Sequence, residues 1–165
     1  MATTNYLSPA SFDISIAKMP NVEFYAQQVS IPSVDSQGAS FESPLKTLYN
    51  VTDKLVYGFL EVNIIVDENM NNYREILEWL EGMGSPETRG DQYNRKREEV
   101  SSYYSDITVI VHNSKKNPNK RFIFKNAFPI SIGPIDLDIR QETITYVTSN
   151  VVFRYDNFIL EDINE

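Results

Sequence analysis

Apolar residues recur at every second position in several stretches of this chain, and that period restricts the fold more than any other feature of the sequence. The clearest stretch, LEVNIIV at residues 60–66, alternates apolar and polar side chains, and so does FDISI at residues 12–16. Successive side chains of a β-strand point to opposite faces of a sheet, so this period predicts half-buried strands. Further strands are predicted at residues 107–111, 121–128 and about 142–155.

The stretch from Val22 to Ile31 alternates as well, but its phase changes near Gln27 and Gln28. An extra residue in a strand produces such a change, so we expect a β-bulge or a bend there. Residues 32–44, PSVDSQGASFESP, are mostly small and polar and predict an exposed loop or the tip of a long hairpin. The chain then returns as an extended segment.

A helical period follows the clearest strand. Asn72 can cap the helix, Glu75 can complete a capping box, and two glycines can end it. Trp79 lies one position off the apolar stripe, so it either widens the buried face or contacts a neighbouring subunit. We therefore expect one helix, at about residues 72–82, that packs on a sheet. Its apolar stripe consists of Tyr73, Ile76, Leu77, Leu80 and Met83.

The order of strands, one helix and more strands predicts an α+β fold with mostly antiparallel pairing. The expected architecture is two packed sheets, or a β-barrel-like arrangement, with the helix on one flank. A single domain at residues 11–160 accommodates these elements, with an N-terminal extension at residues 1–10 and a C-terminal tail at residues 161–165. Residues 85–102 form a long charged connector with few aliphatic side chains.

Charge restricts the function. Acidic residues outnumber basic ones by 23 to 15, and the formal net charge is −8. A protein that grips duplex DNA needs concentrated Lys and Arg, and a membrane-surface helix needs a basic face, so we expect neither activity. A protein past which nucleic acid slides remains compatible with this charge, because attraction would hinder the passage.

The chain contains no Cys, which excludes disulfides, thiolate metal ligands and a Cys nucleophile. The opening sequence, MATTNYLSPASFDISI, lacks the basic and apolar regions of a signal peptide. Apolar stretches are also much shorter than a membrane span. We therefore expect a soluble protein that is made in a cytoplasm.

No complete catalytic set is evident. His112 is the only histidine, and no orienting carboxylate or nucleophile lies near it in the sequence. Residues 67–78 follow a calcium-loop spacing, but Asn72 stands where that loop needs glycine. The alternative is a helix N-terminus that gathers acidic and amide side chains.

An acidic cluster at Asp136, Asp138 and Glu142 has two interpretations. These carboxylates could hold a hard cation or act as an acid–base pair in a small hydrolase. Alternatively, they keep a strand edge from pairing with stray strands. We expect no catalytic residue, no metal and no cofactor.

Together, five segments resemble the tail tube protein family of contractile-tailed bacteriophages and its relatives among tube-initiating baseplate proteins. The resemblance covers most of the chain. It rests on SFDISI at residues 11–16, residues 24–32 with their closing proline, LEVNIIVDE followed by the helix, KNAFP through Gly133, and Leu137-Asp138 with the long closing strand.

The resemblance implies a structural subunit rather than an enzyme. Family members form hexameric rings whose strands close an inner β-barrel, and the rings stack into a tube through which the genome passes. The implied partners are further copies of the chain, sheath, baseplate or tape-measure proteins, and DNA in transit, but no membrane. The implied location is the phage tail of a virion, after synthesis in the bacterial host cytoplasm. A tube initiator, hub or completion protein of the same fold is an alternative role, and a non-viral β-rich binding module is a further one.

Two long polar segments are the expected contacts between stacked rings, namely the hairpin tip at residues 34–42 and the connector at residues 85–102. Ordinary flexible loops are the alternative. Deletion of residues 36–40 is predicted to leave a folded subunit that no longer stacks. The candidate contact residues are Asp35, Ser36, Gln37, Ser40, Phe41, Arg89, Asp91, Tyr93, Arg95 and Arg97, with Trp79 as a further subunit contact.

Overall fold

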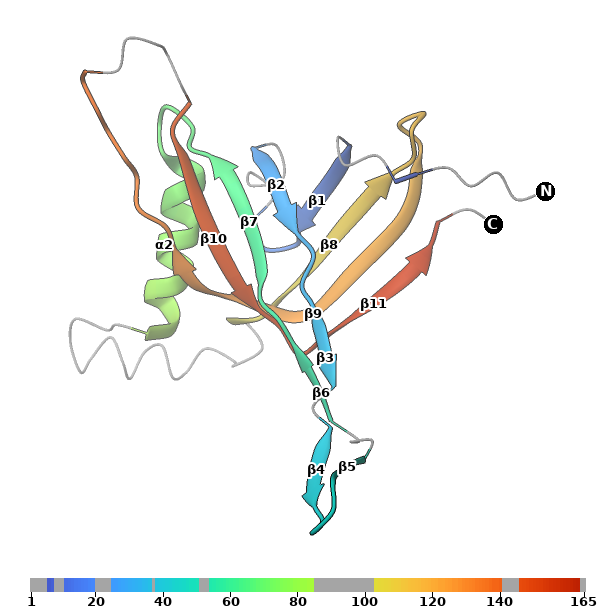
Figure 1. The fold of residues 1–165 in the computed structure, drawn as a ribbon. Helices are drawn as coiled ribbons and strands as arrows, with labels where there is room; N and C mark the ends of the chain where they lie inside the picture. Colours follow the sequence, from blue (N-terminus) through green and yellow to red (C-terminus); the bar gives the residue numbers. More distant parts are fainter. Residues whose placement is uncertain are drawn as a thin grey trace.

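A computed structural model describes residues 6–7, 11–19, 25–36, 38–50, 54–84, 103–140 and 146–163 (Figure 1). These residues form one helix, α2 (Asn71–Gly84), and eleven strands. The strands are β1 (Phe12–Ile16), β2 (Ala26–Ser30), β3 (Val34–Ser36), β4 (Ala39–Glu42), β5 (Thr47–Asn50), β6 (Leu55–Tyr57), β7 (Leu60–Ile65), β8 (Ser105–His112), β9 (Pro118–Ile132), β10 (Thr148–Arg154) and β11 (Asn157–Asp162).

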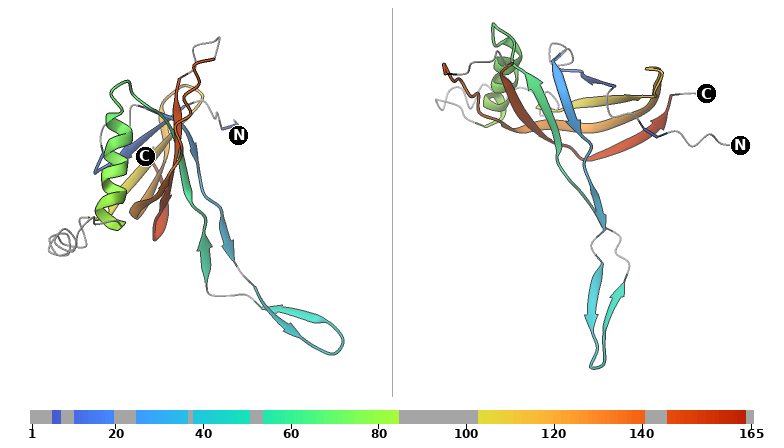
Figure 2. Two further views of the ribbon diagram at one scale, coloured as in Figure 1. Left: turned by 90° about the vertical axis from the view of Figure 1, so that its left-hand side faces the viewer. Right: turned by 45° about the horizontal axis from the view of Figure 1, so that its top comes forward.

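Seven of these strands form one antiparallel sheet in the order β1-β8-β9-β10-β7-β2, with β11 beside β9. The 15-residue strand β9 belongs to both ends of the sheet, because its first part pairs with β8 and β11 and its last part pairs with β10. The sheet bends along β9 into two parts (Figures 1 and 2). We call β1, β8, β11 and the first part of β9 the first half-sheet. The second half-sheet comprises the last part of β9, β10, β7 and β2.

The inward faces of the two half-sheets form the core. In β7, Leu60, Val62 and Ile64 are buried while Glu61 between them is exposed, as the alternation predicts. Helix α2 lies against the sheet and adds Ile76 and Trp79 to this core (Figure 1). The other buried apolar residues are Ile14, Ile16, Met19, Ile107, Val109, Phe124, Ala127, Val151, Phe153 and Tyr155.

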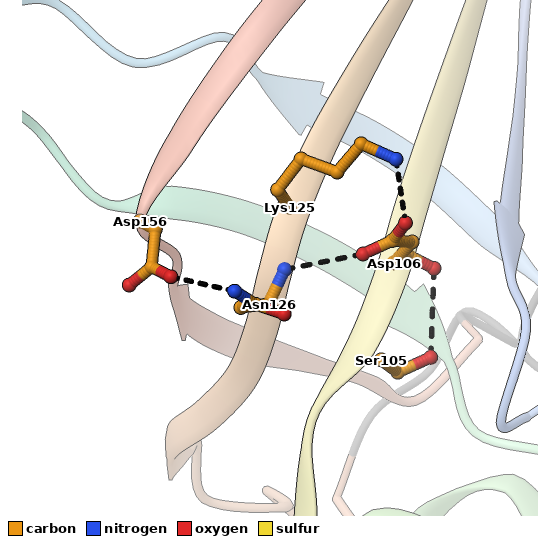
Figure 3. Close-up of polar contacts among 5 residues, drawn as sticks. All are labelled: Ser105, Asp106, Lys125, Asn126 and Asp156. Carbon is orange, nitrogen blue, oxygen red and sulfur yellow. Dashed lines mark hydrogen bonds and ion pairs between the residues drawn. The ribbon is translucent and has the colours of Figure 1, made fainter. Parts of the chain in front are cut away.

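A β-bulge in β9 marks the bend between the half-sheets. Lys125 and Asn126 together oppose the single residue Asp106, and Asn126 has a left-handed backbone with φ of 53°. The Asp106 carboxylate accepts the Asn126 backbone N–H at 3.1 Å and the Lys125 ammonium at 2.8 Å (Figure 3). Asn126 Nδ2 donates in turn to Asp156, between β10 and β11, at 2.7 Å. One carboxylate therefore holds the bulge that lets the strands change direction.

Asp106→Asn is expected to lower the free energy of unfolding by about 1–2 kcal/mol near pH 7. The hydrogen bond from Lys125 keeps the pKa of Asp106 below its ordinary value. A carboxyl with a lowered pKa stabilises the fold above its unfolded pKa of about 3.9, and this contribution disappears as the pH falls through the folded pKa. The difference between the two proteins should therefore shrink below about pH 4 in urea titrations. A difference that persists at low pH would contradict this assignment, and Asp138→Asn, in the exposed loop after β9, is the control.

The helix was predicted almost correctly, but its start differs in detail. Two side chains accept first-turn backbone N–H groups: Asp67 accepts the Asn72 N–H at 3.3 Å, and the Asn72 amide oxygen accepts the Tyr73 N–H at 2.8 Å. The Asn72 side chain is buried and donates to the Ile65 carbonyl at 2.7 Å, which ties the helix to β7. Leu77, which we placed on the buried stripe, is exposed because the buried face is rotated toward Trp79.

The predicted fold class, mostly antiparallel β with one flanking helix, is confirmed. The described strands do not close into a barrel. The predicted bulge in β2 is present as a register shift between Ala26 and Gln28. The predicted final strand at about residues 142–155 corresponds to β10, and residues 141–145 lie outside the described part. Sequence analysis missed β11, which reaches Asp162 and so extends into the expected tail.

Candidate assembly surfaces

A two-stranded arm projects far beyond the sheet (Figure 2). It continues β2 and β7 through the pair β3–β6, and it ends in the pair β4–β5. At its base, the Gly58 N–H donates to the Ser33 carbonyl at 2.9 Å. A Cβ on Gly58 would lie 3.2 Å from the Ser33 hydroxyl, so glycine allows the two chains to approach closely here.

The arm exposes large apolar side chains along most of its length. Phe41 and Leu48 are cross-strand partners and are exposed by 60% and 45%. Tyr49 is exposed as well, next to Leu48 on the opposite face. An isolated two-stranded hairpin is marginally stable in water, and exposed apolar patches mark contact surfaces. The arm is therefore a candidate contact surface for another molecule.

The sequence prediction placed the hairpin tip too early. Residues 34–36 and 39–42 form one side of the arm, and the outermost turn lies at Ser43–Lys46, where the Ser43 N–H donates to the Lys46 carbonyl at 3.1 Å. Gly38 and Pro44 give the same turn signal in the sequence, so the sequence alone could not choose between them. Of the candidate residues, Asp35 and Ser36 lie in β3 and Ser40 and Phe41 in β4. Gln37, Arg89, Asp91, Tyr93, Arg95 and Arg97 lie outside the described residues, as does the whole connector at residues 85–102.

An aromatic cluster anchors the arm. Tyr57, in β6, contacts Tyr155 and Phe158 with ring centroids 6.1 and 5.8 Å apart. Phe124 joins the same cluster through both of those rings. Burial raises the pKa of Tyr155 to about 12, so this phenol stays neutral. The cluster joins the arm to the bend between the half-sheets and fixes the direction in which the arm leaves.

The second half-sheet has two open edges within the described residues. Strand β2 pairs on one side only, with β7. The last part of β9 pairs with β10, whereas β8 accompanies β9 only as far as Ala127. On the outward face between these edges, polar side chains that include Gln28, Asn63 and Asn150 line a hollow. Open edges invite pairing with another strand.

An apolar groove lies at the end of the molecule opposite the arm. Its cavity volume is about 540 Å³, and it is bounded by the start of β2, the turn between β7 and α2, and the segments on either side of residues 141–145. Sequence analysis missed this groove because distant segments build it. Met70, Leu137 and Tyr146 are its exposed apolar side chains, Tyr25 also lines it, and Asp67 and Glu68 provide the acidic charge.

His112 has partners that sequence proximity did not reveal. Its Nδ1 lies 3.1 Å from the Ser11 hydroxyl, and its Nε2 lies 3.2 Å from the Asp13 carboxylate. The backbone N–H of His112 also donates to the backbone carbonyl of Ser11 at 3.2 Å. All three residues belong to the paired segments around β1 and β8, so they join the edge strand to the sheet. We assign them this structural role.

His112→Ala is expected to lower the free energy of unfolding by about 1–3 kcal/mol, because it leaves a buried site empty and Ser11 and Asp13 without their partner. Loss of the contact should loosen β1 in particular. Amide hydrogen exchange along β1 should therefore accelerate more than exchange along β7. Equal acceleration in both strands would contradict a local role.

Of the remaining sequence candidates, Trp79 and Asp138 make contacts within the chain, Asp136 is exposed, and Glu142 lies outside the described residues. Trp79 is only 4% exposed, packs on Phe153 and donates its indole N–H to the Tyr103 carbonyl at 2.8 Å. Asp138 accepts the backbone N–H of Arg140 at 2.9 Å. Among the described residues, no three His, Cys, Asp or Glu side chains are grouped as metal ligands, and no helix is long and apolar enough to cross a membrane.

Comparison with known proteins identifies the fold and the family. No curated protein matches the sequence. A chain of the anti-feeding prophage baseplate shares the fold with a TM-score of 0.64 and 15% identity, over 99% of both chains. A chain of the PVC sheath–tube complex, from an extracellular contractile injection system, shares the fold with a TM-score of 0.69 and 12% identity, over 98% of this chain and 95% of that one. A chain of the anti-feeding prophage cap shares the fold with a TM-score of 0.69 and 10% identity, over 98% of this chain and 95% of that one.

The sequence model of one family, described as phage tail tube protein, matches residues 2–161, which is nearly the whole chain. The chain belongs to the phage tail tube protein family.

Proposed function

We propose that this chain forms closed hexameric rings that stack into a tail tube, and that DNA passes through this tube during delivery by the phage. The observation that carries the proposal is the pair of open edges on the second half-sheet. Strand direction alternates from β9 through β10 and β7 to β2. Strand β2 of one copy can therefore pair antiparallel with the last part of β9 in the next copy, and the alternation continues around the ring.

Ring closure would place one face of the second half-sheet toward the channel. The inward face is already buried in the core, so the polar face with Gln28, Asn63 and Asn150 is the one available. Amide side chains and the carboxylate of Glu61 would offer DNA no concentrated positive charge. The net charge of −8 supports the same conclusion, since a repulsive wall keeps the genome from sticking.

The six-fold symmetry of the proposed ring is taken from a structure that contains a chain of the same fold. The anti-feeding prophage baseplate, one chain of which shares this fold, is a 6-fold symmetrised structure. The arm would span the boundary between rings, and the outer surface would meet sheath, baseplate or tape-measure proteins. The location would be the virion, after synthesis in the host cytoplasm.

Electron microscopy and sedimentation of the purified chain at high concentration test this proposal. Rings with a central channel, and tubes of stacked rings, are the expected result. A stable monomer at every concentration would contradict the proposal.

A role at one end of the tube is the second candidate. The observation in its favour is that cap and baseplate chains share the fold with TM-scores of 0.69 and 0.64 over nearly their whole length. Labelling of this chain in the parent particle would distinguish the two roles, because a main tube protein decorates the whole tube and an end protein labels one end.

A further inference from the structure

We propose that the outermost turn of the arm inserts into the apolar groove of a second copy of this chain, with Leu45 as the inserted side chain. The inference rests on the stacked rings proposed above and assigns the two surfaces that join one ring to the next. We call Ser43–Lys46 the tip, and we call the hollow beside Met70, Leu137 and Tyr146 the groove.

The tip presents a leucine to solvent at the far end of the molecule. Leu45 is 95% exposed, and it follows Pro44 in a turn closed by the hydrogen bond between Ser43 and Lys46. The turn holds this side chain outward at the end of two paired strands. An aliphatic side chain fixed in this position gains free energy once another surface covers it.

The groove offers a complementary surface. Its lining includes Ile65, Met70, Leu137 and Tyr146, and the last two are exposed by 82% and 76%. A cavity volume of about 540 Å³ is sufficient for a leucine and parts of the residues on either side of it. Exposed aromatic and aliphatic side chains that surround a hollow are typical of a binding site rather than of ordinary surface.

The charge of the groove is complementary to the charge of the tip. The groove lining contains two charged residues, Asp67 and Glu68, and both are acidic. The tip carries Lys46 directly after Leu45. Two copies with a net charge of −8 each repel one another, so a contact between them gains from local opposite charges. Insertion of Leu45 would bring the Lys46 ammonium toward this acidic rim.

The positions of the two surfaces produce a stack. The arm leaves one end of the molecule, and the groove lies where β7 ends and α2 begins, at the other end (Figure 1). A contact between different surfaces at opposite ends repeats from copy to copy without closing. Within a ring, all tips would point one way and all grooves would face the other way.

Two single variants test this arrangement by complementation. Leu45→Asp removes the tip and keeps the groove, whereas Leu137→Asp removes the groove and keeps the tip. Both side chains are exposed, so both variants should fold. Each substitution should weaken its contact by at least about tenfold, and each variant alone should give single rings.

Mixing rings of the two variants should produce stacks of two rings and nothing longer, because one intact tip face meets one intact groove face. Ile139→Asp is the matched control, since Ile139 is fully exposed near the groove but does not line it. Mixed rings that stay single, or Leu137→Asp rings that still form tubes, would overturn the inference. Absence of rings in the unsubstituted protein would instead refute the proposed function.

Cross-linking identifies the occupant directly. The chain has no Cys, so Leu45→Cys combined with Leu137→Cys should link neighbouring rings under oxidation, and either substitution alone should not. Lys46→Glu should weaken stacking, and Glu68→Lys in the same chain should restore it. Tyr6 and Leu7 are also exposed. Cross-linking of Leu137→Cys to Leu7→Cys, in place of Leu45→Cys, would show that an N-terminal segment fills the groove and would overturn the inference.

Discussion

Shortening the arm is expected to leave a folded subunit that no longer forms tubes. Ser36 and Leu55 are cross-strand partners in the pair β3–β6, so an Asn-Gly turn can join them directly. This variant removes the pair β4–β5 and the tip but keeps Tyr57 in its aromatic cluster. Because the removed strands are exposed, the free energy of unfolding should change by no more than about 1 kcal/mol.

Rings should persist in this variant, because the open edges of β2 and β9 are untouched. Negative-stain microscopy should therefore show single rings in place of tubes. Denaturant titration should show that the free energy of unfolding of the remaining domain is nearly unchanged. Tubes of normal length would show that the arm is not the contact between rings. Thr47→Ser, a conservative change in the same arm, is the control and should form tubes.

The earlier prediction, deletion of residues 36–40, is a poorer experiment for a structural reason. Ser36, Ala39 and Ser40 lie on one side of the arm only, so the deletion would shift the register of β4 against β5. A failure to stack could then reflect a distorted arm. Removing both strands between cross-strand partners avoids this problem.

The sequence predicted the elements whose signal is local. Alternation in β7, the phase change in β2 and the helical stripe of α2 are each contained within about ten residues, and the structure has all three. Strands at the edges of the sheet were harder to predict from the sequence. In β11, Phe158 faces the core, but Ile159 and Leu160 are both exposed, so no clean alternation remains.

The candidate surfaces depend on distant residues, and this explains why the sequence did not reveal them. The groove combines Tyr25, Met70 and Leu137, which are ordinary apolar residues in three separate segments. Likewise, Ser11 and Asp13 reach His112 only because β1 pairs with β8. The same limit applies to the channel face, since the bulge in β2 decides which side chains point outward.

Removal of the Phe124 ring is expected to cause the largest loss of stability among the substitutions considered. Phe124 is fully buried, and its ring lies 4.9 Å from that of Tyr155 and 5.5 Å from that of Phe158. Truncation of a buried phenylalanine costs about 3–5 kcal/mol, through lost burial and the cavity that remains. A small domain has only about 5–15 kcal/mol of stability, so Phe124→Ala should leave much of the chain unfolded on mild heating.

Phe124→Leu and Tyr57→Ala separate the two functions of the aromatic cluster. Phe124→Leu keeps most of the apolar volume and should cost about 1.5 kcal/mol while rings and tubes still form. Tyr57 lies at the base of the arm, so its loss should reduce stacking more than it reduces the stability of the sheet. Denaturant titration with microscopy of each variant checks both effects. A loss of less than about 1 kcal/mol in the free energy of unfolding of Phe124→Ala would contradict the central position of this ring in the packing. Removal of a fully buried aromatic side chain has so small an effect only where its neighbours collapse into the space.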